Sequence, residues 1–209
     1  SYELFPERKL RIRHTLGNGF YAEYDDHKSL SSEDAVLLKL RMEDIVARDI
    51  PITRVKRLAT EVAEEYRRYD FDDRLELLDT RPRLYRTVNY LGDMPGYFYG
   101  ALAPSSGYVS RFDLAPYYNG FYVAIPARTT PEQVTTAIHH DKMFDIFHEY
   151  QQWIDVMGVP TVGDLNRRVM EGDSSELIQI AEAFHENKIA AIARAIAEAN
   201  SERGVRMAL

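Results

Sequence analysis

The stretch LRIRHTLGNGFYAEY, from Leu10 to Tyr24, decides the fold of the N-terminal half of the chain. Bulky residues alternate in two short runs, which is typical of half-buried β-strands. Between the runs, Gly17 and Gly19 flank Asn18 and supply positions where the backbone can take a positive φ. The stretch therefore predicts a two-stranded antiparallel hairpin.

Helical and β-rich segments alternate outward from this hairpin. A serine cap, an acidic first turn and apolar residues at helical spacing predict a helix from about Ser32 to Arg48. A β-branched run over 50–55 predicts a strand, and Thr60 is expected to cap a helix over 61–69, with a further short helix over 74–78. Residues 84–126 are rich in aromatic side chains and glycine, which indicates an antiparallel sheet.

The last third of the sequence has helical periodicity. Helices are predicted near Pro131, from Lys142 to Met157, after a Thr161 cap, and from Ser174 or Ser175 onward. We therefore expect the α+β class, with an antiparallel sheet packed by helices in residues 1–126 and a helical connector in residues 127–209.

Composition excludes several classes of protein. The chain has 209 residues, 45% hydrophobic and 28% charged, so it carries enough apolar mass for a globular core. Its formal charge of -7 argues against non-specific binding of a phosphate backbone. Tight binding of a nucleic acid would therefore need a local basic patch. No apolar run is long enough for a membrane helix, and cysteine is absent, so we expect a cytoplasmic chain with no membrane partner.

No self-contained active site emerges from the residues. A phosphate-binding glycine loop is missing, and His140 and His148 are about two helical turns apart, too far to share one metal ion. Ser105 and Ser106 precede a glycine as in a nucleophile elbow, but Pro104 favours a turn between strands. We predict no catalytic residue, no metal site and no cofactor within this segment.

One set of motifs resembles a known family. The string Asn18-Gly19-Phe20-Tyr21, the helix opening Leu30 to Asp34 and the segment Gly100 to Ser105 occur in the order seen in the editing domain of threonyl-tRNA synthetases, over roughly Lys9 to Ile125. The resemblance implies that Phe98 stands where that family has a cysteine and Leu102 where it has a histidine. Neither side chain binds metal or moves a proton, so we expect no editing activity.

A second resemblance extends over nearly the whole chain. The strings PSSGYVSRFDL (Pro104 to Leu114) and ELIQIAEAFHE (Glu176 to Glu186) resemble the N-terminal part of bacterial uridine-kinase-like nucleoside kinases. It implies a regulatory or substrate-sensing region that precedes a kinase domain outside this sequence. That kinase domain would be the partner, and ATP and magnesium would be its cofactors.

Ligand contacts are expected on the strands that match the editing cleft, with ordinary sheet surface as the alternative. The binding candidates are Arg13, His14, Tyr21, Tyr108, Arg111 and Tyr117. The ligand would be a nucleoside or tRNA. Two other functions remain open: an aminoacyl-tRNA deacylase with replacement groups such as His14, and an RNA-binding module. The basic patch of that module would comprise Arg11, Arg13, Lys56, Arg57 and Arg111.

Overall fold

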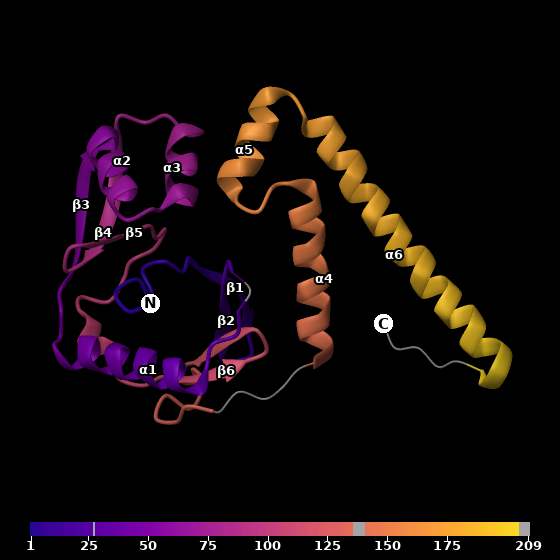
Figure 1. Cartoon of the computed structure of the whole chain (residues 1–209), viewed down its shortest axis with the longest axis horizontal. Coiled ribbons are helices and arrows are strands. Elements are labelled where there is room, and N and C mark those ends of the chain that lie inside the picture. The colour runs from indigo at the N-terminus through magenta and orange to yellow at the C-terminus, as the bar shows by residue number, and fades with distance from the viewer. Residues whose placement is uncertain (27, 136–140, 205–209) are drawn as a thin grey trace. The chain divides into compact units, whose positions relative to one another are not determined.

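The computed structural model describes residues 1–26, 28–135 and 141–204 and confirms the α+β class (Figure 1). The chain folds into two compact units. Residues 1–62 and 85–141 form the first unit, and residues 63–84 and 142–209 form the second. Because the second unit takes residues from two parts of the chain, these units differ from the consecutive segments 1–126 and 127–209, whose standing as domains stays a prediction.

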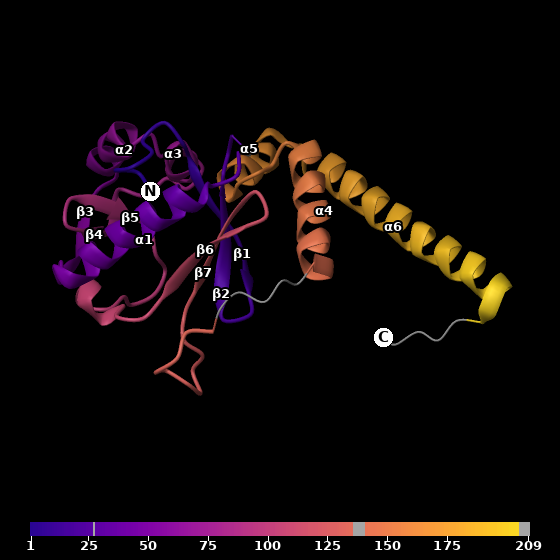
Figure 2. The ribbon, with the colours of Figure 1, turned by 60° about the horizontal axis from the view of Figure 1, so that its bottom comes forward.

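A four-stranded antiparallel sheet, ordered β1-β2-β7-β6, forms the centre of the first unit. The predicted hairpin is present as β1 and β2, and Figure 2 shows all four strands with α1 beside them. The bounds are β1 (Leu10–Leu16), β2 (Gly19–Tyr24), α1 (Ser32–Ala47), β6 (Asp113–Tyr117) and β7 (Gly120–Ala124).

Helix α1 covers one face of this sheet. Ser31 caps it as predicted, because the Ser31 side chain accepts a hydrogen bond from the amide of Asp34. Lys39 on α1 donates to Asp113 on β6 over 2.7 Å. The core between helix and sheet consists of Ala22, Tyr24, Leu30, Ala35, Leu38, Leu114, Phe121 and Val123.

The aromatic segment does not form one sheet. Its first strands join the predicted strand near Ile52 in a separate three-stranded sheet, ordered β3-β4-β5. The bounds are β3 (Ile52–Leu58), β4 (Tyr85–Leu91) and β5 (Met94–Gly96). A short 3-10 helix, η1 (Ser106–Tyr108), follows in the loop toward β6.

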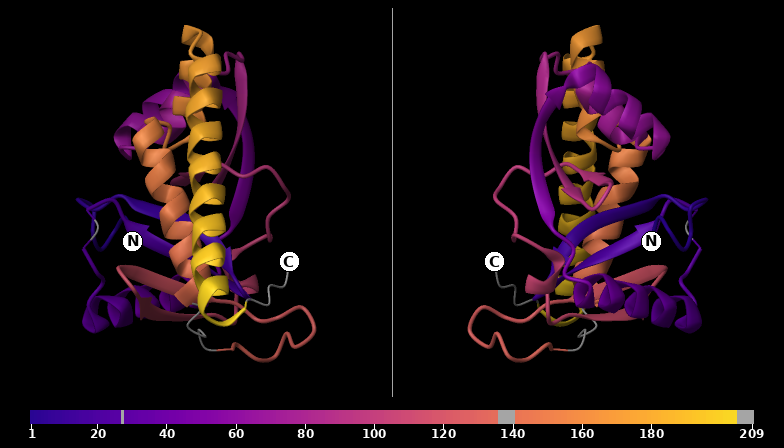
Figure 3. Two further views of the ribbon diagram at one scale, coloured as in Figure 1. Left: turned by 90° about the vertical axis from the view of Figure 1, so that its right-hand side faces the viewer. Right: turned by 90° about the vertical axis from the view of Figure 1, so that its left-hand side faces the viewer.

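The second unit is helical. Its helices are α3 (Asp72–Asp79), α4 (Asp141–Met157), α5 (Val162–Glu171) and α6 (Ser174–Arg203), together with most of α2 (Ala59–Arg68). Trp153 on α4 stacks on Phe184 of α6 with ring centroids 5.5 Å apart, and Figure 3 shows α6 as one long, continuous helix. The predicted Thr161 cap is confirmed as a capping box with Asp164.

Three local expectations are wrong. Helix α2 begins at Ala59, immediately after β3, so Thr60 lies inside the helix and not at its cap. Asp173 occupies the N-cap of α6, so Ser174 and Ser175 both lie in its first turn. Residues 131–135 form no helix; within them, Arg111 donates to the carbonyl of Glu132 and pairs with its carboxylate. Residues 136–140 and 205–209 lie outside the described part.

Candidate functional site

Four of the six predicted binding residues meet on the sheet face opposite α1: Arg13, His14, Tyr21 and Tyr117. Tyr21 and Glu23 alternate along β2 with the core residues Ala22 and Tyr24, so their side chains point to this second face. From β1, the Arg13 Nε donates to Glu23 Oε1 over 2.7 Å, and the Tyr21 hydroxyl donates to Glu23 Oε2 over 2.8 Å. The carboxylate therefore holds a guanidinium and a phenol at once.

This arrangement, which we call the Glu23 cluster (Arg13, Tyr21 and Glu23), is largely shielded from solvent. Glu23 is 8% exposed and Tyr21 only 2%. Burial, followed by the hydrogen bond to the Glu23 carboxylate, raises the pKa of the Tyr21 phenol far above its usual range. Tyr21 is consequently a fixed hydrogen-bond donor to Glu23, and we expect the cluster to stabilise the sheet because both donors of the largely buried group are bonded to the carboxylate.

Aromatic rings extend the cluster across the sheet. The Tyr117 ring lies 6.0 Å from the Tyr21 ring and 5.9 Å from the Tyr122 ring, between centroids. The Tyr122 hydroxyl donates to the buried carbonyl of Leu16 over 2.7 Å. Since Tyr117 and Tyr122 are buried as well, this part of the matched face is packed interior, where a ligand has no access to Tyr117 without local opening.

His14 borders the same rings. Its imidazole centroid lies 5.4 Å from that of Tyr21, and its Nδ1 lies 3.3 Å from the carbonyl oxygen of Thr15. Burial lowers the pKa of His14, against the opposing effects of Thr15 and Glu23. The imidazole is therefore neutral at neutral pH, the state that a general base requires.

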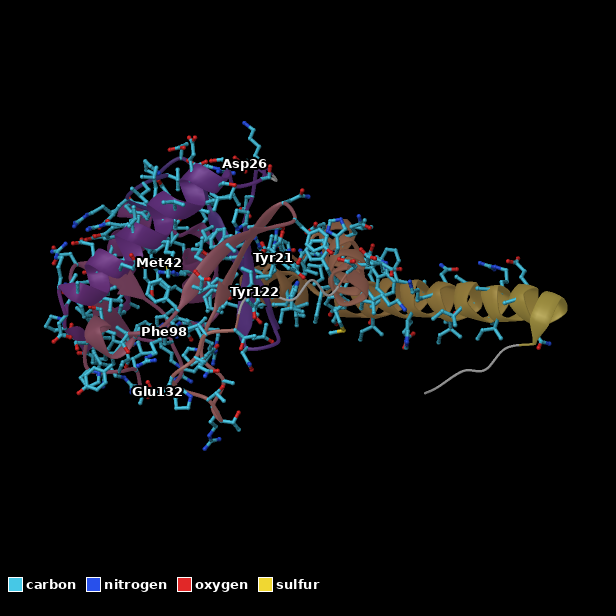
Figure 4. All side chains as sticks on the ribbon, turned by 90° about the horizontal axis from the view of Figure 1, so that it is seen from below. Tyr21, Asp26, Met42, Phe98, Tyr122 and Glu132 are labelled. Atoms are coloured by element: carbon cyan, nitrogen blue, oxygen red, sulfur yellow. The ribbon has the colours of Figure 1, made fainter. Side chains whose placement is uncertain are left out.

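The other two candidates lie elsewhere. Tyr108 ends η1 with an exposed ring, and Arg111 forms an ion pair with Glu132. Figure 4 shows Glu132 well separated from Tyr21 and Tyr122. The six candidates thus do not line one surface.

The basic patch predicted for RNA binding is largely neutralised. Acidic side chains pair with four of its five cations: Arg11 with Asp25, Arg13 with Glu23, Arg57 with Glu61, and Arg111 with Glu132. The fifth cation, Lys56, places its Nζ 4.9 Å from the centroid of the Tyr85 ring. Paired guanidinium groups attract a phosphate backbone weakly, so this set does not form a positive surface.

The serine pair has a structural role, as the turn interpretation predicted. The Ser105 hydroxyl donates to Asp49, and the Ser106 hydroxyl donates to the carbonyl of Ile45 over 2.6 Å while accepting from the amide of Ile50 over 2.8 Å. These bonds join η1 to the end of α1. Both hydroxyl groups are therefore engaged in hydrogen bonds within the fold.

Phe98 and Leu102 are both substantially exposed in the loop that follows β5. Exposed rings of Tyr99 and Tyr108 lie in the same loop, and Tyr99 is 80% exposed. In the described part of the chain, no group of three or more metal-ligating side chains occurs, and no helix is long and apolar enough to cross a membrane. His139 and His140 fall outside that part.

Sequence reasoning missed Glu23 and Asn89. Glu23 could have been found, because the hairpin register places it on the same side as Tyr21. Asn89 on β4 is 4% exposed, and its Nδ2 has no hydrogen-bond partner among the described residues. Nothing in the strand sequence YRTVNYL marks that amide as buried.

Comparison with known proteins gives one consistent relationship. No family model matches the chain. A threonine–tRNA ligase of Polynucleobacter necessarius subsp. necessarius is 29% identical over 113 residues, which cover 54% of this chain and 18% of the ligase. Those of Anaplasma marginale (strain Florida) and Carboxydothermus hydrogenoformans are 32% identical over 129 residues and 31% identical over 112 residues, covering 19% and 18% of the ligase.

The chain thus has partial similarity to threonine–tRNA ligases over about half of its length, and it spans less than a fifth of theirs. This similarity agrees with the first resemblance and with the α+β fold. It favours a tRNA-related module over a kinase-related one, since these matches give the kinase resemblance, with its kinase-domain partner, no support.

Proposed function

We propose that this chain is a tRNA-binding module that does not hydrolyse its ligand. The observation that carries the proposal is the similarity, over about half of the chain, to ligases whose name specifies tRNA. An enzyme that edits needs a group that binds a metal ion or moves a proton. The exposed positions that correspond to such groups by resemblance, Phe98 and Leu102, are apolar, which supports binding without hydrolysis.

The accessible chemistry suits an unpaired nucleic-acid strand better than a duplex. Proteins hold single strands by stacking bases on aromatic rings beside cations that contact phosphates. The loop after β5 offers exposed rings at Phe98, Tyr99 and Tyr108, and the neighbouring sheet offers the cations Arg54 and Lys56. Because the net charge is -7, such binding is local and not a general attraction to polyanions.

Fluorescence anisotropy with labelled RNA tests this function. The probes are a tRNA acceptor-stem minihelix with its unpaired 3′ end and the same stem with a blunt end. We expect the first to bind more tightly, with a slope of log K against log salt of about -0.7, from one phosphate contact of a single strand. Equal binding of both probes, or no binding at about 50 mM salt, would contradict the proposal.

Hydrolysis of an aminoacyl ester is the second candidate function. The neutral, half-buried imidazole of His14 beside Tyr21 favours it, because this imidazole can accept a proton. Incubation of the protein with seryl-tRNA distinguishes the two functions. We expect no deacylation above the protein-free rate, whereas turnover that disappears in His14→Ala would establish the enzyme.

A place in front of a nucleoside kinase domain remains a separate proposal. In that case, the partner is the kinase domain, which would bring its own ATP and magnesium, and the module senses a nucleoside. The coding sequence beyond Leu209 tests this directly, since a phosphate-binding loop must follow.

In the tRNA-binding role, the module requires no cofactor and works in the cytoplasm with the translation machinery.

A further inference from the structure

One face of the three-stranded sheet carries two exposed cations and a buried amide that has no hydrogen-bond partner among the described residues. Asn89 on β4 lies directly opposite Arg54 on β3 and Gly96 on β5, and Lys56 lies two residues beyond Arg54. Directly opposed residues and alternate residues of a strand share a face. A Cβ added to Gly96 would lie 2.8 Å from the Phe98 ring, so that ring lies on the same face, beside Asn89.

We call this surface the Asn89 face; its residues are Arg54, Lys56, Tyr85, Asn89 and Phe98. Arg54 and Lys56 are exposed, and in the described part of the chain neither forms an ion pair with a carboxylate. The Lys56 ammonium lies over the half-exposed Tyr85 ring. The Cα atoms of Arg54 and Lys56 are about 7 Å apart along the strand, so their long side chains can close on a single phosphate.

The amide of Asn89 supplies a second, independent observation. Its side chain is almost fully buried in the sheet, yet its Nδ2 donates to no acceptor among the described residues. Buried donors are nearly always paired, because an unpaired one loses its hydrogen bond to water without replacement. An amide left in this state, beside an exposed aromatic ring and two cations, is typical of a polar group reserved for a ligand.

We propose that the Asn89 face binds one unpaired nucleotide. The base stacks on the Phe98 ring, and local opening around the buried Asn89 side chain lets an oxygen or ring nitrogen of the base accept a hydrogen bond from Asn89 Nδ2. The phosphate lies between Arg54 and Lys56. This inference rests on the tRNA-binding function, which it deepens by naming the residues that recognise an unpaired end.

Isothermal titration of the full chain with adenosine 5′-monophosphate, adenosine and inorganic phosphate tests the site. We expect the nucleotide to bind more tightly than adenosine or phosphate alone, because only the nucleotide reaches both the ring and the cations. On nitrogen-15 spectra, the Asn89 side-chain amide shifts on addition of the nucleotide. Inorganic phosphate that binds as tightly as the nucleotide would overturn the proposal by leaving the base without a role.

Asn89→Leu is the sharpest variant. Leucine has a similar size and removes the unpaired donor, so the protein stays folded and its Tm does not fall, while nucleotide affinity drops about tenfold. A merely structural asparagine predicts a lower Tm and unchanged affinity. Phe98→Leu, at an exposed position, provides a second test that does not depend on the fold of the sheet; we expect a loss of about tenfold or more from stacking.

Arg57→Gln is the matched control. Arg57 directly follows Lys56 on β3, faces the opposite side of the sheet and pairs with Glu61. We expect its loss to leave nucleotide affinity unchanged, whereas Lys56→Gln weakens it.

The two proposals fail in different ways. If the minihelix binds wild type and Asn89→Leu equally, the nucleotide site is wrong and the tRNA-binding function stands. If the mononucleotide binds and the minihelix does not, the site stands and the tRNA-binding function is wrong.

Discussion

Replacing Glu23 with glutamine tests whether the Glu23 cluster stabilises the sheet. In the native protein, the two carboxylate oxygens accept from Arg13 over 2.7 Å and from Tyr21 over 2.8 Å. Glutamine keeps the volume, but it offers only one acceptor oxygen and turns an NH2 group toward the other donor. One charge-assisted bond is lost, and a largely buried guanidinium is left without its counter-charge.

The expected cost follows from these two effects. A hydrogen bond to a charged group contributes about 1.5–3 kcal/mol, and an uncompensated buried charge adds to that loss. We expect Glu23→Gln to lower the free energy of unfolding by about 2–3 kcal/mol. The assay is urea denaturation followed by circular dichroism, with the slope of free energy against urea unchanged.

Glu61→Gln provides the matched control. Glu61 accepts from Arg57 over 3.1 Å, but both side chains are exposed, so its loss is expected to cost less than about 0.5 kcal/mol. A double-mutant cycle with Arg13→Met isolates the Arg13–Glu23 coupling, expected at about 1 kcal/mol or more. If Glu23→Gln costs no more than Glu61→Gln, the cluster is not a stabilising element and our reasoning is wrong.

Three further changes test the packing of the first unit. Gly19→Ala should destabilise by about 3 kcal/mol in denaturant melts, because a Cβ there would lie 2.2 Å from the carbonyl oxygen of Val123; a cost near zero would refute the close approach of β2 and β7. Tyr122→Phe should cost about 1–2 kcal/mol by leaving a buried carbonyl unpaired, and an unchanged stability would show that water replaces the hydroxyl. Lys39→Met should cost about 0.5–1 kcal/mol at pH 7. The hydrogen bond from Lys39 lowers the pKa of Asp113, so the pair's contribution is present above the unfolded pKa near 4 and is lost as the pH falls through the folded value. A gap from wild type that does not shrink as the pH falls below about 4 would contradict this.

Local sequence signals predicted the parts of the fold that depend on neighbouring residues. The hairpin turn required Gly17, whose φ is +54°, and the start of α1 required the Ser31 hydroxyl, so both could be read from the sequence. The cap at Thr161 is likewise complete within four residues. By contrast, β3 passes directly into α2, and no cap residue marks such a boundary.

The candidate site was harder to predict because it depends on pairing between distant strands. Arg11 and Arg13 look like a positive surface in the sequence, but the pairing of β1 with β2 brings Arg13 to Glu23 on β2 and Arg11 to Asp25, directly after β2. Tyr117 looked accessible, and its burial became evident only when the rings of Tyr21 and Tyr122 came together in space. The unpaired Asn89 amide likewise results from tertiary burial.

Mapping the bound surface by NMR tests the central claim most directly. Nitrogen-15-labelled protein is titrated with the tRNA acceptor-stem minihelix, and the amide shifts are assigned to residues. We predict that the shifts concentrate in β3, β4 and the loop over 97–112, and that the amides of Arg13, Tyr21 and Glu23 hold their positions. Shifts centred on those three residues, or no shifts at all, would contradict the account.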